Sequence, residues 1–247
     1  MVLQEYILVF LVTTFAGMYG LIFGGGSFLT LPTLFLLGVD PKVAIATNQL
    51  GSIGQMATGS WIFLKTHKVY RDIITWVAPA FLTGTLIGVF ILIQIDGELI
   101  KKAVSVMIIV FAFLTLLKNP EKQPLSNIRN EKKILGLFLA VFLGIYAMVI
   151  TASTGTMLIF VLMYLFGLKF KRAIENRQPI VLIGVLPAVI LLWTKGYIDP
   201  LLAIPLFTGR ACGAFLGANL VLKTRTRYLR VVFSVVIILL AVKVLLF

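Results

Sequence analysis

The chain has 247 residues, of which 60% are apolar and only 13% are charged. A soluble domain carries about 45–50% apolar and about 25% charged residues, so this composition excludes an ordinary cytosolic enzyme and a disordered protein. It is typical of a polytopic membrane protein, because only lipid removes the need for a polar exterior. The net charge of +13 comes from Lys and Arg clustered between apolar runs, where positive-inside topology explains them and nucleic acid is not an expected partner.

Eight apolar runs are long enough to cross a bilayer, which takes about 17–25 helical residues. In chain order they lie near 5–23, 43–64, 72–95, 98–117, 134–152, 173–194, 200–222 and 229–247. Two shorter runs, near 27–38 and 156–167, cannot span, and each follows a break of small residues, at 24–27 and 153–156. We therefore predict an all-α polytopic membrane protein with about eight spanning helices and two short re-entrant or half helices.

The two halves of the chain match at one fixed offset, which we call the repeat offset. It is the shift in numbering that places Gly26 on Gly155, and the same shift places Lys42 on Lys171. The two glycines lie in the breaks, and the two lysines lie at the ends of the short segments that follow. These matches predict an internal duplication. The first repeat covers 1–117, a polar linker covers 118–133, and the second repeat covers 134–247.

Loop charge predicts that the two repeats have opposite orientations in the membrane. The loop 65–71 carries three Lys or Arg residues and is expected on the cytoplasmic side, whereas its counterpart 194–200 carries one Lys and is expected outside. The hairpins 5–38 and 134–167 must then each begin and end on one side. This inverted-topology repeat places the N-terminus and the C-terminus outside a cell inner (cytoplasmic) membrane.

The breaks predict a site for an anion. A half helix that begins inside the membrane has free N–H groups and a positive dipole end, and two such ends facing each other can hold an anion between them. The residues concerned are Gly25, Gly26 and Ser27 in the first half and Gly155 and Thr156 in the second. The alternative is that Ser27 and Thr156 only cap their own helices.

Polar side chains follow each short segment and add to the predicted site. They are Thr47, Asn48 and Gln49 in the first half and Asn176 and Arg177 in the second. The repeat offset aligns Thr47 with Asn176, and a slip of one residue pairs the two asparagines. Their amides could donate to a substrate oxygen or simply join helices. Arg177 is expected to lie shallower and to reach the cytoplasmic face.

Arg210 lies about ten residues into an apolar run, near the expected bilayer centre. A charge at that depth is costly and is a functional hypothesis by default, since a buried guanidinium attracts a negative solute. The alternative is a structural ion pair with Glu175. Lys42 and Lys171 end the short segments and are interpreted as interface anchors.

The order and spacing of these motifs resemble the TauE/SafE family of membrane permeases, over essentially the whole chain. The resemblance is carried by the residues 24–27, Pro32, 38–39, 44–48, Gly51, Gly54, 155–156, Gly167, 171–176, 195–199 and the glycines up to Gly217. It implies export of a small organosulfur or sulfur-oxyanion solute, such as sulfite, a sulfonate or sulfoacetate, across a prokaryotic cytoplasmic membrane.

Together these observations predict a secondary transporter for a small anionic substrate that works by alternating access, one repeat bundle moving against the rest. Membrane lipid is the other expected partner, a proton or sodium ion remains open as coupling ion, and no cofactor is expected. Two alternatives remain. One is a non-transporting membrane scaffold or assembly subunit. The other is an intramembrane enzyme, which is disfavoured because only Glu175 is placed for acid–base chemistry.

Overall fold

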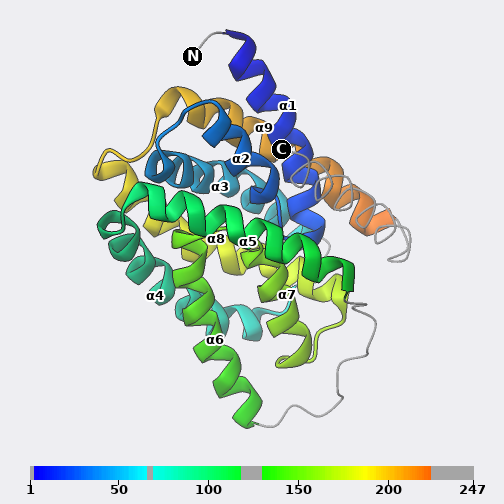
Figure 1. Cartoon of the computed structure of the whole chain (residues 1–247). Helices are drawn as coiled ribbons and strands as arrows, with labels where there is room; N and C mark the ends of the chain where they lie inside the picture. Colours follow the sequence, from blue (N-terminus) through cyan, green and yellow to red (C-terminus); the bar gives the residue numbers. More distant parts are fainter. Residues whose placement is uncertain (1–2, 66–68, 118–129, 224–247) are drawn as a thin grey trace.

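A computed structural model describes residues 3–65, 69–117 and 130–223, with side chains described outside 108–117 and 130–132. Within these ranges every element of regular secondary structure is a helix (Figure 1). The helices are α1 (Leu3–Phe23), α2 (Ser27–Leu36), α3 (Pro41–Lys65), α4 (Arg71–Gln94), α5 (Gly97–Leu117), α6 (Asn130–Val149), α7 (Thr154–Tyr164), α8 (Phe170–Thr194) and α9 (Pro200–Lys223).

The helices follow the predicted apolar runs closely, and the two short segments form separate helices, α2 and α7. Among the described residues, four helices, α1, α4, α8 and α9, are long and apolar enough to cross a membrane. The total of about eight spans stays a prediction, because the run 229–247 lies outside the described residues. The helix α6 begins at Asn130, so the end of the predicted linker 118–133 is helical.

The breaks after α1 and α6 touch each other, as predicted. A Cβ added to Gly155 would lie 2.6 Å from the Cα of Gly24, so the close contact requires glycine at position 155. Position 24 favours glycine for a different reason, because its φ is +87°. The alternative that Ser27 and Thr156 cap their own helices was wrong. The N-cap residues are Gly26 and Ser153, and neither has a side-chain capping bond. The Thr156 hydroxyl lies past the first residue of α7 and donates instead to a carbonyl at the end of α1.

Glycines bring two helix pairs into backbone contact, α1 with α9 and α4 with α6. A Cβ on Gly217 would lie 2.8 Å from the carbonyl oxygen of Met18, and one on Gly88 would lie 2.8 Å from that of Ile145. Only a residue without a side chain permits such approach. The glycines of these helices therefore act in packing.

Two pairs of hydrogen bonds recur in the two halves at the repeat offset. The amide of Asp199 donates to Thr47 Oγ1 at 3.1 Å, and the amide of Tyr70 donates to Asn176 Oδ1 at 2.6 Å. Likewise Lys42 Nζ donates to the carbonyl of Ile93 and Lys171 Nζ to that of Leu222, at 2.8 and 3.2 Å. These two lysines thus bind carbonyls in the last turns of α4 and α9, which gives the predicted anchors a specific partner.

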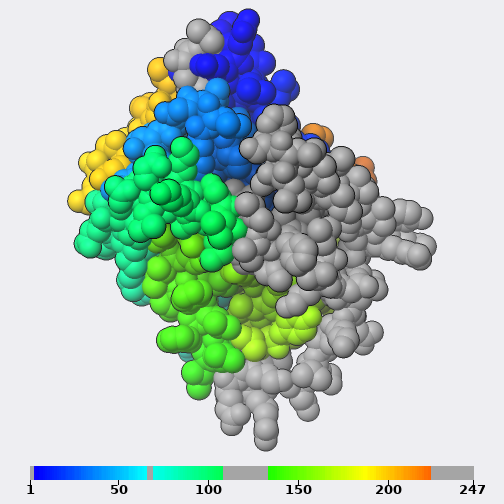
Figure 2. All heavy atoms as spheres, viewed as in Figure 1, coloured from blue at the N-terminus to red at the C-terminus, as the bar shows by residue number. Residues whose placement is uncertain are grey.

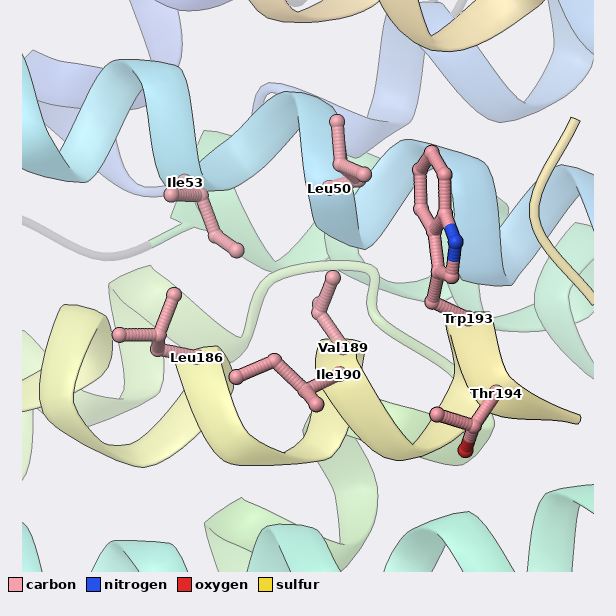
Figure 3. A pocket seen from close by; sticks show the side chains of 7 residues that line it. All are labelled: Leu50, Ile53, Leu186, Val189, Ile190, Trp193 and Thr194. Carbon is pink, nitrogen blue, oxygen red and sulfur yellow. The ribbon is translucent and has the colours of Figure 1, made fainter. Parts of the chain in front are cut away.

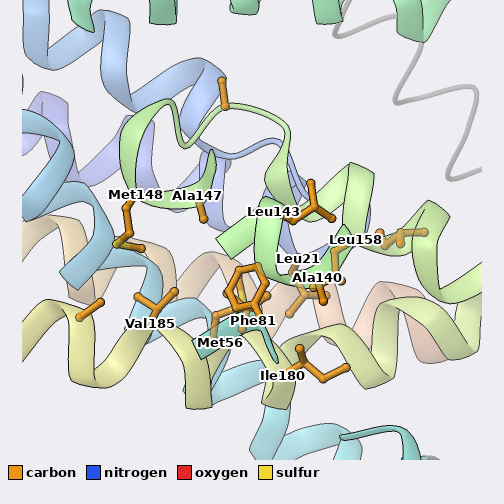
Figure 4. Packing of buried hydrophobic residues seen from close by; sticks show 14 of the residues in the cluster. Leu21, Met56, Phe81, Ala140, Leu143, Ala147, Met148, Leu158, Ile180 and Val185 are labelled. Carbon is orange, nitrogen blue, oxygen red and sulfur yellow. The ribbon is translucent and has the colours of Figure 1, made fainter. Parts of the chain in front are cut away.

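The apolar core lies where α1, α4, α6, α7 and α8 meet. Leu21, Phe81, Met148, Leu158 and Ile180 are all buried there, and Figure 4 shows their side chains converging from these helices. On one face of the molecule α2 and the start of α5 lie side by side (Figures 1 and 2), in agreement with the contact between them. One side of α2 is thereby buried, including Ser27 and Thr30, whereas Leu36 at its end is 88% exposed.

Candidate functional site

Polar side chains in α3 and α8 face the interior of the bundle. Those of Thr47, Asn48, Gln49, Glu175, Asn176, Arg177 and Gln178 are at most 3% exposed. Burying so many polar groups is costly unless each finds a hydrogen-bond partner. Their partners therefore decide what each residue does.

Four residues from three helices form what we call the Arg210 cluster: Ser27, Thr30, Asn48 and Arg210. Arg210 Nη2 in α9 donates to Asn48 Oδ1 at 2.6 Å and to Thr30 Oγ1 at 2.8 Å. The Thr30 hydroxyl also donates to Asn48 Oδ1, and Asn48 Nδ2 donates to Ser27 Oγ at 3.2 Å. The structure thus joins three of the predicted site residues.

Thr30 is the member of the Arg210 cluster that sequence reasoning missed. It follows Ser27 by three residues in α2, so the two share one face of that helix. A signal was therefore present, because a hydroxyl at that spacing from Ser27 points the same way.

The Arg210 guanidinium is 2% exposed and is hydrogen-bonded to neutral groups. Across the described side chains no carboxylate lies within 4.0 Å of it, and its Nε has no hydrogen-bond partner there. Glu175, the alternative partner, instead forms an ion pair with Arg172 at 3.0 Å, one turn earlier in α8. The positive charge of Arg210 is therefore not compensated by these groups, and such a buried charge attracts an anion.

Arg177 does not reach the cytoplasmic face, so that expectation was wrong. It is fully buried, and its Nη2 donates to the carbonyls of Gly20 and Leu21 at 2.8 Å each. Gln178 Nε2 also donates to Leu21, and Thr156 Oγ1 donates to Phe23. These carbonyls belong to the last turn of α1. The carbonyl groups of a last turn have no amide partner within their own helix, and the negative end of the helix dipole favours a cation there. The second half thus caps the end of α1.

Gln49, in the first half, makes the corresponding contact with the end of α6. Its Nε2 donates to the carbonyl of Ala147, in the last turn of α6, and lies 3.4 Å from Thr151 Oγ1. Gln49 and Gln178 are related by the repeat offset, like the other recurring contacts. Each half therefore supplies an amide that holds the break of the other half.

Thr47 and Asn176 are bonded away from the Arg210 cluster. Asn176 accepts from the Tyr70 amide and donates to the carbonyl of Arg172 at 2.8 Å, and Thr47 accepts from the Asp199 amide. These contacts recur at the repeat offset and not at the one-residue slip that pairs the asparagines. At the repeat offset Asn48 aligns with Arg177.

A cavity of about 320 Å³ lies between α3 and α8, and none of these polar residues lines it. Figure 3 shows its lining: Leu50 and Ile53 from α3, and Leu186, Val189, Ile190, Trp193 and Thr194 from α8. Because the lining is almost entirely apolar and uncharged, this cavity is unsuited to an anion. No cluster of three or more His, Cys, Asp or Glu able to hold a metal ion occurs among the described residues.

The comparisons with known proteins agree with the resemblance. The family described as "Sulfite exporter TauE/SafE" matches residues 9–244. A "Probable membrane transporter protein" of Haemophilus influenzae is 29% identical, over 85% of this chain and 84% of its own length. The "Probable membrane transporter protein YjnA" of Bacillus subtilis is 23% identical, over 87% and 89%.

A third similar protein, the "Probable membrane transporter protein YfcA" of Escherichia coli K12, is 22% identical over 96% of this chain and 88% of its own length. No solved structure matches the chain. The family match covers nearly the whole sequence, both breaks and all four residues of the Arg210 cluster. The chain therefore belongs to the sulfite exporter TauE/SafE family of multi-pass membrane transporters.

Proposed function

We propose that this protein is a secondary transporter that exports a small organosulfur or sulfur-oxyanion solute and binds it at the Arg210 cluster. The observation that carries the proposal is the buried guanidinium of Arg210, whose described partners are all neutral. A guanidinium matches the planar, multidentate geometry of oxyanions. The hydroxyls of Ser27 and Thr30 and the amide of Asn48 can turn to donate to the same ligand.

The start of α2 adds to this site. Ser27 is both the first residue of α2 and a member of the Arg210 cluster. The N–H groups of Gly25, Gly26 and Ser27 precede the first intrahelical bonds, so the helix dipole and these donors favour negative charge at the same place. The predicted role of the first break in anion binding is thereby retained.

The two halves are proposed to be inverted-topology repeats, 1–117 and 134–247, with the substrate between them. The hydrogen bonds that recur at the repeat offset and the contact between the breaks support this arrangement. Ser27, Thr30 and Asn48 come from the first half, whereas Arg210 comes from the second. A site shared by two repeats is exposed to either side in turn when helices move, as alternating access requires.

The function is tested with the full chain in proteoliposomes loaded with sulfite, a sulfonate or a simple carboxylate. We expect efflux of at least one anion, its loss in Asn48→Ala and Arg210→Gln, and its retention in Arg71→Gln, which removes an exposed arginine. Imposed proton and sodium gradients identify the coupling ion. If none of the three anions moves, the anion assignment is wrong and a scaffold is favoured. Normal transport by Asn48→Ala removes that residue from the site.

The orientation is tested by labelling single cysteines in whole cells with a membrane-impermeant maleimide. The native thiol, Cys212, is exposed and is first replaced by alanine. We expect Lys195→Cys to react from outside and Arg71→Cys to react only after the membrane is permeabilised. Labelling of both from one side contradicts the inverted topology.

A further inference from the structure

A second buried arginine, Arg177 of α8, lies beside the start of α7 and has unused hydrogen-bond donors. Arg177 uses Nη2 to cap α1, but its Nη1 and Nε have no hydrogen-bond partner among the described residues. Nη1 lies against the second residue of α7, since a Cβ on Gly155 would be 2.8 Å from it. An unsatisfied buried donor on a charged group costs more than one on a neutral group.

Ser153, the N-cap residue of α7, offers a further unused group. Its side chain is fully buried, and its Oγ has no hydrogen-bond partner within the described ranges. The N–H groups of Thr154, Gly155 and Thr156 form the first turn of α7, an 11-residue helix, and have no acceptor within it. The start of α7 therefore carries a hydroxyl and a set of backbone donors, and Arg177 Nη1 lies beside this helix start at Gly155.

The electrostatics at this place favour an anion. The positive end of the α7 dipole faces a full positive charge, and no described carboxylate lies within 4.0 Å of Arg177. In a medium of low dielectric constant these like charges repel strongly. An anion between them would reverse the sign of the interaction and accept from the unused donors.

We propose that the start of α7 is a second anion site, built from Arg177 Nη1, Ser153 Oγ and the first-turn N–H groups, and that it takes a small oxyanion. It shares no residue with the Arg210 cluster. This inference rests on the proposed function, because the second site would bind the same solute that the protein transports. Several acceptor oxygens on one small ligand match donors that converge from a guanidinium, a hydroxyl and a helix terminus.

The two sites use the duplicated fold differently. At the repeat offset, Arg177 stands where Asn48 stands in the first half, and the fully buried Phe81 stands where Arg210 stands in the second. Arg210 therefore lies at the first break, whereas Arg177 lies where the two breaks meet, since its Nη1 would lie against a Cβ on Gly24 and 2.8 Å from one on Gly155. An anion released by the Arg210 guanidinium would find a second guanidinium at the contact between the breaks.

The test is calorimetric titration of the purified full-length protein with sulfite. We expect two equivalents per chain, one lost in Arg210→Gln and the other in Arg177→Gln, with both retained in Arg71→Gln. Because Arg177→Gln also removes caps from α1, Ser153→Gly is the decisive variant. Glycine suits the φ of 64° at this position, so the fold is kept while the hydroxyl is removed. Ser153→Gly should raise the Kd for one of the two bound sulfite ions about tenfold.

The possible results separate this inference from the proposed function. One equivalent that Arg210→Gln abolishes and Ser153→Gly leaves unchanged overturns the second site alone. One equivalent that Ser153→Gly weakens and Arg210→Gln leaves unchanged supports the second site and overturns the Arg210 cluster as the binding site. No binding by the wild-type protein overturns both.

Discussion

Replacing Gly155 with alanine should separate the two breaks. The new Cβ would lie 2.6 Å from the Cα and 2.7 Å from the carbonyl oxygen of Gly24, whereas carbon atoms in contact stay about 3.5–4.0 Å apart. The backbones must therefore move apart by about 1 Å. Overpacking of this kind costs about 1–3 kcal/mol. Since each kcal/mol lowers the Tm of a chain of this size by about 2–4 °C, we expect a fall of about 2–12 °C.

The assay is thermal unfolding of the purified full-length protein in detergent, and the matched control is Gly97→Ala. Gly97 also begins a helix region and has an ordinary φ, but its Cβ would meet nothing closer than a side-chain atom of Pro41 at 3.7 Å. Sulfite efflux should fall with Gly155→Ala and persist with Gly97→Ala. Equal Tm values for the two variants would refute the close contact between the breaks.

Three further predictions concern single hydrogen bonds. Asn48→Asp places a carboxylate 2.6 Å from Arg210 Nη2, where it pairs with the guanidinium in place of the substrate anion. Efflux should therefore be lost, while the Tm falls less than in Asn48→Ala. Retained efflux contradicts this prediction. Thr47→Val leaves the Asp199 amide without its acceptor and should cost about 1–3 kcal/mol in chemical denaturation, whereas an unchanged midpoint would count against that bond. Lys42→Met and Lys171→Met should lower the Tm by similar small amounts, and a large difference would argue that the contacts are not equivalent.

The helices could be predicted from sequence because the length of an apolar run and the position of glycine are local properties. The predicted runs and the described helices agree to within a few residues for most elements. The union of Ser27, Asn48 and Arg210 was also predictable, since polar groups at membrane depth have few stable positions other than beside one another.

The role of Arg177 could not be predicted, because its partners are main-chain carbonyls in the first helix of the other half, far away in the chain. Sequence shows a side chain's chemistry, but it does not show which helix end faces that side chain. The sequence also left two alignments open, Thr47 with Asn176 at the repeat offset and Asn48 with Asn176 after a slip of one residue. The recurring contacts follow the repeat offset, because they join Thr47 to Asp199 and Asn176 to Tyr70.

The contacts made by the glycine-rich helices bear on which parts of the molecule can move as rigid bodies. The first helix of each half packs against a late helix of the other, α1 against α9 and α6 against α4. The halves are thus interlaced, in the manner of two subunits that have exchanged elements. In the proposed transport cycle, a moving unit that coincided with residues 1–117 or 134–247 would have to break the closest helix crossings, α1 with α9 and α4 with α6. We therefore expect a moving unit that combines helices from both halves, in place of the single repeat bundle predicted from the sequence.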